Sequence, residues 1–252
     1  MKKLQKIIDI VVTIFFSIFF ILSCAFISII PICADNNYYM KQYVKNGVNQ
    51  HLPYTLEELE QITDSITNYM FRGASSMQIE INGKNVFSDQ AILHMADVKV
   101  LFVGGMIIGF ISLAILIATS IYLFVRRKEI KSIFRKVNYS TFGVFLLLII
   151  AICIYAIVDF DQAFIDFHHL IFPDPVKFDN AFFPNNDTLI NILTIDFFFD
   201  IFFAIIIRLV ALFAIYFIII QCLYGKVFRR ISRVKMITIG LEYRKKFLLY
   251  FG

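Results

Sequence analysis

The sequence contains no tryptophan and only four cysteines, and 17% of its 252 residues are charged. The cysteines all lie within or at the ends of apolar runs, which excludes a disulfide framework and a zinc-binding pattern; they are Cys24, Cys33, Cys153 and Cys222. The chain also has no glycine-rich phosphate loop, no GxSxG nucleophile elbow and no HExxH motif. Familiar nucleotide-binding, serine-hydrolase and zinc-protease sites are therefore not expected.

Hydrophobic residues are abundant. They make up 59% of the chain, and the mean hydropathy is +0.75. A soluble domain of this size cannot hide so much apolar surface, so the composition predicts an integral membrane protein. The net charge of +5 is distributed unevenly along the chain and gives no indication of a nucleic-acid partner.

Four apolar runs predict membrane spans, at about 7–32, 100–125, 139–158 and 197–222. About 20 residues of helix suffice to cross a hydrocarbon core of roughly 30 Å. The first run contains Ile-Leu-Ser-Cys ending at Cys24, which resembles a lipoprotein cleavage site, but it continues in apolar sequence, so we expect an uncleaved span. In the second run, Gly104, Gly105 and Gly109 predict a close approach of another helix.

Charge predicts the orientation of these spans. The N-terminus, the loop Arg126–Lys136 and the tail from Lys226 are strongly basic, whereas segments 35–97 and 159–196 are net acidic. The positive-inside rule therefore predicts two cytoplasmic termini and two extracellular acidic segments. All four histidines then lie on the extracellular side.

The first acidic segment shows signs of a folded cap. Tyr54–Phe71 has the pattern of an amphipathic helix, and Thr55 and Glu58 fit a capping box. Met77–Phe87 contains Asn82-Gly83, the dipeptide favoured in type I′ turns, and predicts a small hairpin.

The predicted fold is thus an all-α membrane protein with four transmembrane helices and a small extracellular α+β cap between the first two. The expected divisions are an N-terminal tail with the first span (1–34), the cap (35–98), the second span (99–125), a cytoplasmic loop (126–138), the third span (139–158), an extracellular re-entrant or interfacial segment (159–196), the fourth span (197–222) and a basic cytoplasmic tail (223–252).

Several polar residues are candidates for chemistry. His94 and Asp97 share one face of the predicted helix Phe87–Val125, where the carboxylate can orient the imidazole. His168 and His169 lie among phenylalanines, which favours a neutral imidazole, and the spacing to Asp166 favours His169 of the two. The alternative is that these residues are ordinary polar groups at a headgroup boundary.

Arg208 lies about half-way along the fourth span. A charged residue at that depth usually pairs with another group or faces a cavity. It is interpreted either as the wall of a lipid-headgroup cavity or as an interhelical polar contact, and its position alone favours the contact.

Two stretches together resemble one family. FSDQAILHMADVK resembles a motif with His followed by Asp-Val-Lys, and FHHLIF…FFPNNDTLINILTIDFFFD resembles its companion. Both are motifs of the lipoprotein intramolecular transacylase of low-GC Gram-positive bacteria, a four-span membrane protein. The order of the elements and the number of spans agree, so the resemblance covers nearly the whole chain.

The resemblance implies an activity. Members of this family move the sn-2 acyl chain of a diacylglyceryl lipoprotein to the α-amino group of its N-terminal cysteine, giving the lyso-form. It implies diacylglyceryl lipoproteins and membrane phospholipid as partners, a monomer in the bacterial plasma membrane, an active site on the extracellular leaflet, and no cofactor or metal. Its two essential histidines correspond to His94 and His168, against the spacing argument for His169.

The residues can be given expected roles on this basis. We expect His94 as base toward the amine and His168 as acid or oxyanion partner, or the reverse. Supporting roles are expected for Asp97, Lys99 and Asp187, with Asp97 orienting His94 and Lys99 one possible oxyanion donor. Substrate contacts are expected from Phe167, Phe172 and Arg208.

The sequence departs from the family pattern at a few positions. Ala91 stands where an acidic residue is expected and Thr194 where proline is expected, and Phe182 or Phe183 replaces an expected tryptophan. Two other classes of function stay open at this point. They are a non-enzymatic membrane accessory or immunity protein, and a lipid or lipoprotein ester hydrolase.

Overall fold

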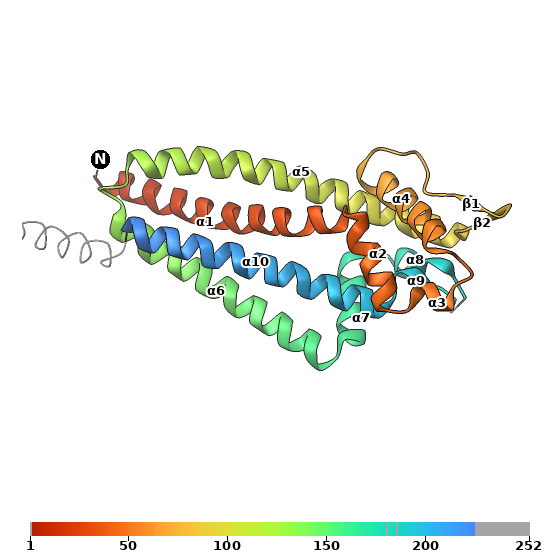
Figure 1. The fold of residues 1–252 in the computed structure, drawn as a ribbon. Coiled ribbons are helices and arrows are strands. Elements are labelled where there is room, and N and C mark those ends of the chain that lie inside the picture. Colours follow the sequence, from red (N-terminus) through yellow and green to blue (C-terminus); the bar gives the residue numbers. More distant parts are fainter. Residues whose placement is uncertain (1, 180, 185, 225–252) are drawn as a thin grey trace, which may run out of the picture.

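The structure is a computed structural model that describes residues 2–179, 181–184 and 186–224. Four long helices run side by side (Figure 1): α1 (Lys2–Cys33), α5 (Asp89–Val125), α6 (Lys131–Val158) and α10 (Ile195–Tyr224). Each is long and apolar enough to cross a membrane. The predicted all-α fold with four spans is confirmed. Residues 225–252 of the expected basic tail lie outside the described part of the chain.

Helix α1 is the centre of the bundle, because it packs against each of α5, α6 and α10. Aromatic side chains fill the contacts toward α6 and α10. Phe20 of α1 lies 4.1 Å from Tyr216 of α10 and 5.7 Å from Phe142 of α6, measured between ring centroids. Helix association in a membrane depends on close van der Waals packing, because no water is excluded when two helices meet. These aromatic contacts therefore stabilise the association of α1 with α6 and α10.

The contact between α1 and α5 requires a glycine at one position. A Cβ atom added to Gly109 would lie 2.3 Å from the ring of Phe26, so only glycine fits beneath that ring. At Gly104 and Gly105, an added Cβ atom would meet nothing within 4 Å. The expected close approach is therefore present at Gly109, and the expectation was wrong for Gly104 and Gly105, which face open space.

Polar contacts connect the helices at the end away from the cap. Arg126, at the end of α5, forms an ion pair with the buried Asp9 of α1 at 3.0 Å, and the Tyr122 hydroxyl donates to the same carboxylate at 2.7 Å. Further along α1, the Asn138 amide of α6 donates to Ser17 Oγ at 2.9 Å. These contacts fix the relative rotation of α1 against its neighbours.

The expected cap is present at the other end of the bundle. It contains α2 (Asn36–Lys45), α3 (Val48–His51), α4 (Leu56–Phe71) and a hairpin of β1 (Glu80–Ile81) and β2 (Lys84–Asn85). The Thr55 capping box is formed in both directions. Asn82 and Gly83 both have positive φ, 53° and 72°, as the predicted turn requires. The β part is small, with two residues in each strand.

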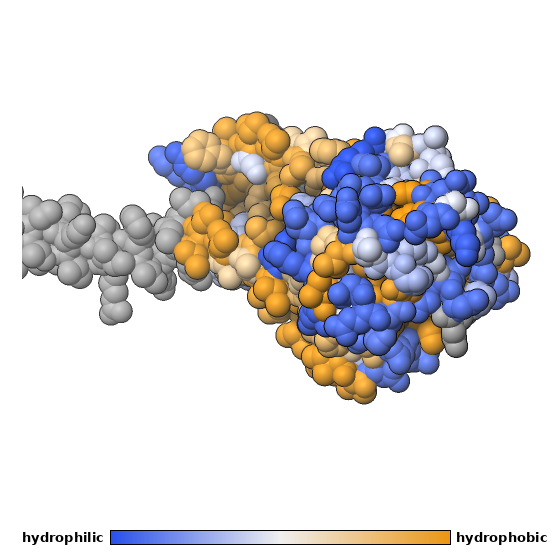
Figure 2. Space-filling model, turned by 45° about the vertical axis from the view of Figure 1, so that its right-hand side comes forward, coloured by the Kyte–Doolittle hydropathy of each residue, from blue (hydrophilic) through white to orange (hydrophobic). Residues whose placement is uncertain are grey.

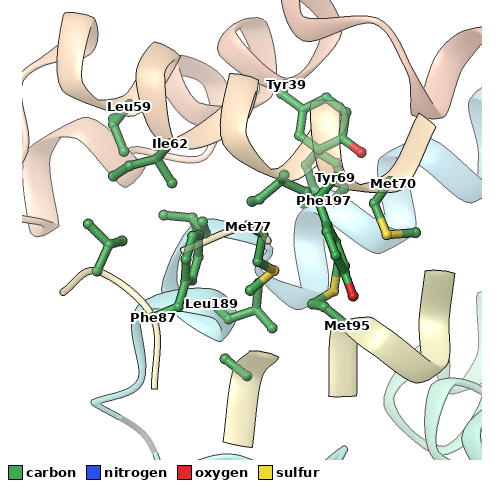
Figure 3. Packing of buried hydrophobic residues seen from close by; sticks show 14 of the residues in the cluster. Tyr39, Leu59, Ile62, Tyr69, Met70, Met77, Phe87, Met95, Leu189 and Phe197 are labelled. Atoms are coloured by element: carbon green, nitrogen blue, oxygen red, sulfur yellow. The ribbon is translucent and has the colours of Figure 1, made fainter. Parts of the chain in front are cut away.

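A hydrophobic core joins this cap to the bundle (Figure 3). It includes Tyr39 of α2, Leu59 and Ile62 of α4, and Met77 and Phe87 of the intervening segment. The same core contains side chains from the start of α5, from α9 (Thr188–Ile192) and from the start of α10; these are Met95, Leu189 and Phe197. The first turns of α5 are thus held inside a protein core before the helix enters its apolar run.

The segment between α6 and α10 folds back over this end of the bundle. It forms α7 (Phe160–Ile171), α8 (Pro175–Asp179) and α9. Phe160 and Phe164 of α7 contact Phe199 and Phe198 of α10, at 5.2 and 4.9 Å between centroids. In Figure 2, hydrophilic residues gather over the cap end, and hydrophobic residues cover much of the visible bundle. This distribution places the cap, α7 and α8 at one membrane boundary.

Candidate functional site

His94 lies in the second turn of α5, before the apolar run of that helix. Ser88 caps the helix, with its hydroxyl accepting from the Ala91 N–H at 3.1 Å. The flanking Ala91 and Met95 are buried in the cap core, and His94 itself is only 8% exposed. Packing on both sides of the residue therefore determines the direction of the imidazole.

His168 lies in the last turn of α7 and is 9% exposed. Its Nδ1 lies 2.8 Å from the Phe164 carbonyl oxygen, one helical turn earlier. Because a carbonyl oxygen only accepts, Nδ1 carries the proton in this hydrogen bond. In the neutral ring, the lone pair is then on Nε2.

The two imidazoles face each other. Their ring centroids are 6.2 Å apart and the planes are inclined by 26°. Phe172 contacts both rings, at 5.5 Å from His94 and 6.0 Å from His168. Phe183 lies 5.5 Å from His94, and Phe164 lies 4.2 Å from His168. Two histidines from separate parts of the chain thus meet in an aromatic environment.

This environment favours neutral imidazoles. Burial lowers the pKa of His94 to about 4; the charge of a protonated His168 acts in the same direction, and Asp97 acts against both. Burial also lowers the pKa of His168, while its hydrogen bond to Phe164 acts in the opposite sense. Both side chains are therefore proton acceptors at neutral pH.

The structure separates His168 from its neighbour His169. The His169 ring is exposed and stacks on Phe178 at 3.5 Å between centroids. Asp166, which the spacing argument paired with His169, accepts hydrogen bonds from Tyr155 and Gln162 at 2.5 and 2.9 Å. The arrangement brings together the two histidines that the resemblance selected, His94 and His168, and leaves His169 outside this pair.

Two of the expected supporting residues bind groups other than the imidazoles. Asp97 forms an ion pair with Lys177 of α8, and it acts on His94 through its charge. The Lys99 ammonium donates to the Ala74 carbonyl at 3.0 Å and lies 3.9 Å from the centre of the Tyr69 ring. Lys99 therefore connects α5 to the end of α4 in this arrangement.

Asp187 holds the segment before α9 against the start of α5. One carboxylate oxygen accepts from the Ser88 hydroxyl at 2.5 Å, and the other accepts from the Leu189 N–H at 2.8 Å, capping α9. Nearby, the Gln90 amide donates to the Phe182 carbonyl at 2.8 Å. These contacts, with the Lys177–Asp97 pair, connect segment 177–189 to the first turns of α5 and bring Phe183 onto His94.

The three residues expected to contact substrate lie at different distances from the imidazole pair. Phe167 is 54% exposed and lies at 5.8 Å, edge to face, beside His168, whereas Phe172 is buried and contacts both imidazoles from one side. Arg208 is exposed on α10 and is not among the side chains that contact either ring. Phe164 is a functional candidate that the sequence did not identify, and only the run of phenylalanines around it indicated an aromatic site. Phe183 was noted only as one of two possible replacements for an expected tryptophan, and its contact with His94 was not expected.

The residues that depart from the family pattern can be located in the structure. Ala91 is fully buried in the cap core. Thr194 caps α10, with its hydroxyl accepting from the Phe197 N–H at 3.2 Å. Phe182 and Phe183, the two candidates for the position of the expected tryptophan, lie 6.5 Å from His168 and 5.5 Å from His94, respectively. Among the described residues, no three histidine, cysteine or carboxylate side chains are arranged to hold a metal ion.

The chain resembles known proteins in sequence and in fold. Residues 11–198 match the family model described as lipoprotein intramolecular transacylase Lit. A solved structure of membrane-integral Lit from Bacillus cereus superimposes with a TM-score of 0.68 at 17% identity, covering 91% of this chain and 98% of that one. A second structure of that protein, with a histidine-to-arginine substitution, gives 0.65 at 16% identity, covering 94% and 97%.

A third structure, with a histidine-to-alanine substitution, gives a TM-score of 0.66 at 16% identity, covering 87% and 96%. Among curated protein sequences, none matches the chain. The solved structures show a common fold, and the family model spans most of the sequence. The chain belongs to the Lit family of lipoprotein intramolecular transacylases.

Proposed function

We propose that this protein moves the sn-2 acyl chain of a diacylglyceryl lipoprotein to the α-amino group of the lipoprotein's N-terminal cysteine. The observation that carries the proposal is the pair of buried imidazoles, His94 and His168, facing each other at the cap end of a membrane bundle. An ester near the acyl region and a polar amine can both reach such a boundary. Membership of a transacylase family supports the same reaction.

The reaction needs two proton transfers. The amine nitrogen attacks the ester carbonyl carbon and gives up a proton, the bond to the sn-2 oxygen breaks, and that oxygen takes up a proton. An ester becomes an amide, and no water, oxidant or nucleotide is consumed. Two neutral imidazoles suit these steps, since a positioned acid or base typically contributes about 10²–10⁴-fold.

The hydrogen bond at Phe164 favours His168 as the base. Because Nδ1 of His168 donates to that carbonyl, its Nε2 has a free lone pair for the proton of the attacking amine. The imidazolium that forms keeps the same hydrogen bond and then gives the Nε2 proton to the leaving sn-2 oxygen. This reverses the first of the two role assignments made from the sequence.

His94 is then the partner of the carbonyl oxygen. Its pKa of about 4 keeps the ring neutral through the reaction, and a neutral imidazole can still donate one hydrogen bond to a developing oxyanion. The Nδ1 atom of His94 is buried and forms no hydrogen bond with the described residues. The His94 ring is therefore held in place by the packing of its neighbours, and no hydrogen bond from the described part of the chain to Nδ1 orients it.

The amine and the ester belong to one molecule, so the protein can accelerate the reaction by holding these two groups within reach of each other. Phe172, buried against both imidazoles, limits where the ester can lie. Phe167 is exposed beside His168 and is placed to contact an acyl chain. We assign Asp187 and Asp97 to positioning, because they fasten segment 177–189 to α5.

The proposed site is metal-independent and lies on the extracellular side of the plasma membrane, with both termini in the cytoplasm. The basic loop Arg126–Lys136 at the opposite end of the bundle supports this orientation. Lipoproteins carry their modified cysteine on that face. We propose a monomer that acts on one lipoprotein at a time.

Mass spectrometry of a lipoprotein N-terminal peptide tests the proposal. Cells that make only the diacyl form are compared with and without this protein. The expected product is an N-acyl, S-monoacylglyceryl cysteine of unchanged total mass. His94→Ala and His168→Ala should lower its formation at least about 100-fold, while His169→Ala, the matched control, should leave it intact.

Other results of this experiment would contradict the proposal. Loss of one acyl chain from the peptide would identify a hydrolase. An unchanged peptide with wild-type protein in the membrane would favour a non-enzymatic protein. Normal transfer by either alanine variant would remove the imidazole pair from the mechanism.

A further inference from the structure

Arg208 is a charged residue within a membrane span that has no protein partner in the described part of the chain. It lies 13 residues after Ile195, the start of α10, and is exposed. That separation corresponds to about 20 Å along the helix axis. An arginine at this depth is costly unless another group satisfies its charge, so such a residue points to a function.

The geometry of α10 directs Arg208 toward α2. Phe197 contacts Tyr38 of α2, with 6.2 Å between ring centroids. Arg208 follows Phe197 by eleven residues, which places both on the same helix face to within about 20°. Helical side chains lean toward the N-terminus of their helix, which for α10 is the cap end. The guanidinium therefore extends from the membrane span up toward Tyr38.

The environment of Tyr38 agrees with this direction. Burial and the charge of Asp200 raise the pKa of Tyr38, while a weak hydrogen bond with Gln42 and the charge of Arg208 act in the opposite sense. Tyr38 thus lies within electrostatic reach of both charged residues on α10.

The polar groups around Tyr38 do not all have strong hydrogen-bond or ion-pair partners among the described residues. Tyr38 Oη and Gln42 Oε1, one turn apart on α2, are buried and form no hydrogen bond of ordinary geometry with the described residues, although the two side chains interact weakly with each other. The nearby Asp200 is already taken, because Lys45 lies 2.6 Å from both of its carboxylate oxygens. A guanidinium without an ion-pair partner and a weakly bonded hydroxyl remain in the described residues, which together fit an anion with several acceptor oxygens.

We infer that Arg208 and Tyr38 bind the phosphodiester of a glycerophospholipid in the leaflet on the cap side. The planar guanidinium pairs with two phosphate oxygens, and the Tyr38 hydroxyl donates to a third acceptor. The acyl chains of that lipid lie along the apolar outer surface of α10, where Ile207, Ile215 and Ile218 are 68%, 55% and 64% exposed. A neutral diacylglyceryl group has no charge to satisfy Arg208. The site is independent of the proposed transacylation.

Native mass spectrometry of the purified protein tests this site. Detergent-solubilised protein is given dioleoylphosphatidylglycerol or dioleoylglycerol, which share their chains and glyceryl esters and differ in the phosphate. Wild-type protein should retain the phospholipid and release the diacylglycerol. Arg208→Gln should weaken phospholipid retention about tenfold or more, as expected for loss of a charged hydrogen bond. Lys41→Gln, which removes an exposed cation on α2, should have no effect.

Tyr38→Phe keeps the ring on Phe197 and removes only the hydroxyl, so it reports on the site even where Arg208→Gln disturbs folding. It should weaken retention by a few-fold. Equal phospholipid retention by wild-type protein and both variants would overturn the inference. Retention of dioleoylglycerol that depends on Arg208 would also overturn it, because the side chain would then recognise an ester.

Discussion

At the scale of single residues, the tautomer of His168 decides which histidine accepts the proton. The substitution His168→Asn tests this, because an asparagine amide can still donate to the Phe164 carbonyl but offers no Nε2 lone pair. We expect its membrane level and thermal unfolding to match wild type, and its transfer rate to fall at least about 100-fold. The rate is measured on lipoprotein peptides by mass spectrometry. Retention of transfer by a well-folded His168→Asn protein would exclude His168 as the base.

The low pKa of His94 predicts a dependence of stability on pH. In the unfolded chain the imidazole binds a proton near pH 6.5, whereas in the folded protein it does so only near pH 4. Between these values the unfolded state binds more protons. The contribution is therefore complete above about pH 6.5 and is lost as the pH falls toward 4, at most roughly 3 kcal/mol.

Thermal unfolding in detergent at pH 7.5 and pH 4.5 measures this effect. Wild-type protein should lose on the order of 5 °C more on acidification than His94→Gln, which cannot titrate. His169→Gln should follow wild type, because that ring is exposed and stacks on Phe178. Identical losses in wild type and His94→Gln would mean that burial does not penalise the charged ring.

The sequence predicted these residues only in part. His94 and His168 stand in motifs that are recognisable without a structure, and the motif corrected the spacing argument for His169. Phe183 could not be predicted as a contact of His94, because it depends on how segment 177–189 docks on α5. Asp97 was expected to hold the imidazole, and its ion pair with Lys177 could not be read from helix spacing.

At the scale of helices, the contact between α1 and α5 depends on one glycine. Gly109→Ala would place a Cβ atom 2.3 Å from the Phe26 ring and force α5 away from α1. We expect a loss of about 1–3 kcal/mol in the free energy of unfolding, as for other overpacked contacts. Gly105→Ala is the matched control, since the same methyl group there meets nothing within 4 Å and alanine favours a helix.

Thermal unfolding in detergent distinguishes the two glycines. Gly109→Ala should unfold several degrees below wild type, and Gly105→Ala should unfold at or slightly above the wild-type temperature. The sequence named three glycines on this helix as one close-packing surface. Only the position of Phe26 on α1, which no local pattern reveals, selects Gly109 among them.

At the scale of the whole molecule, the four spans follow from length and hydropathy, and the proposed orientation rests on the distribution of charge. The cap helix α4 and its hairpin were also predictable, because a capping box and Asn-Gly are local signals. The folding of α7, α8 and α9 over the end of the bundle was not. It depends on contacts between distant segments, such as Phe164 with Phe198 and Asp187 with Ser88.

Orientation decides whether the imidazole pair can meet its proposed substrate. Lipoproteins present the modified cysteine outside the plasma membrane, so His94 and His168 must lie at the outer end of the bundle. Single cysteines introduced at Asn82, in the exposed hairpin turn, and at Lys128, in the exposed turn between α5 and α6, report on the two ends. A membrane-impermeant maleimide applied to intact cells should label the cysteine at 82 and label that at 128 only after lysis. The reverse pattern would place the histidines on the cytoplasmic side, away from every mature lipoprotein, and intramolecular transfer could not be the function of this pair.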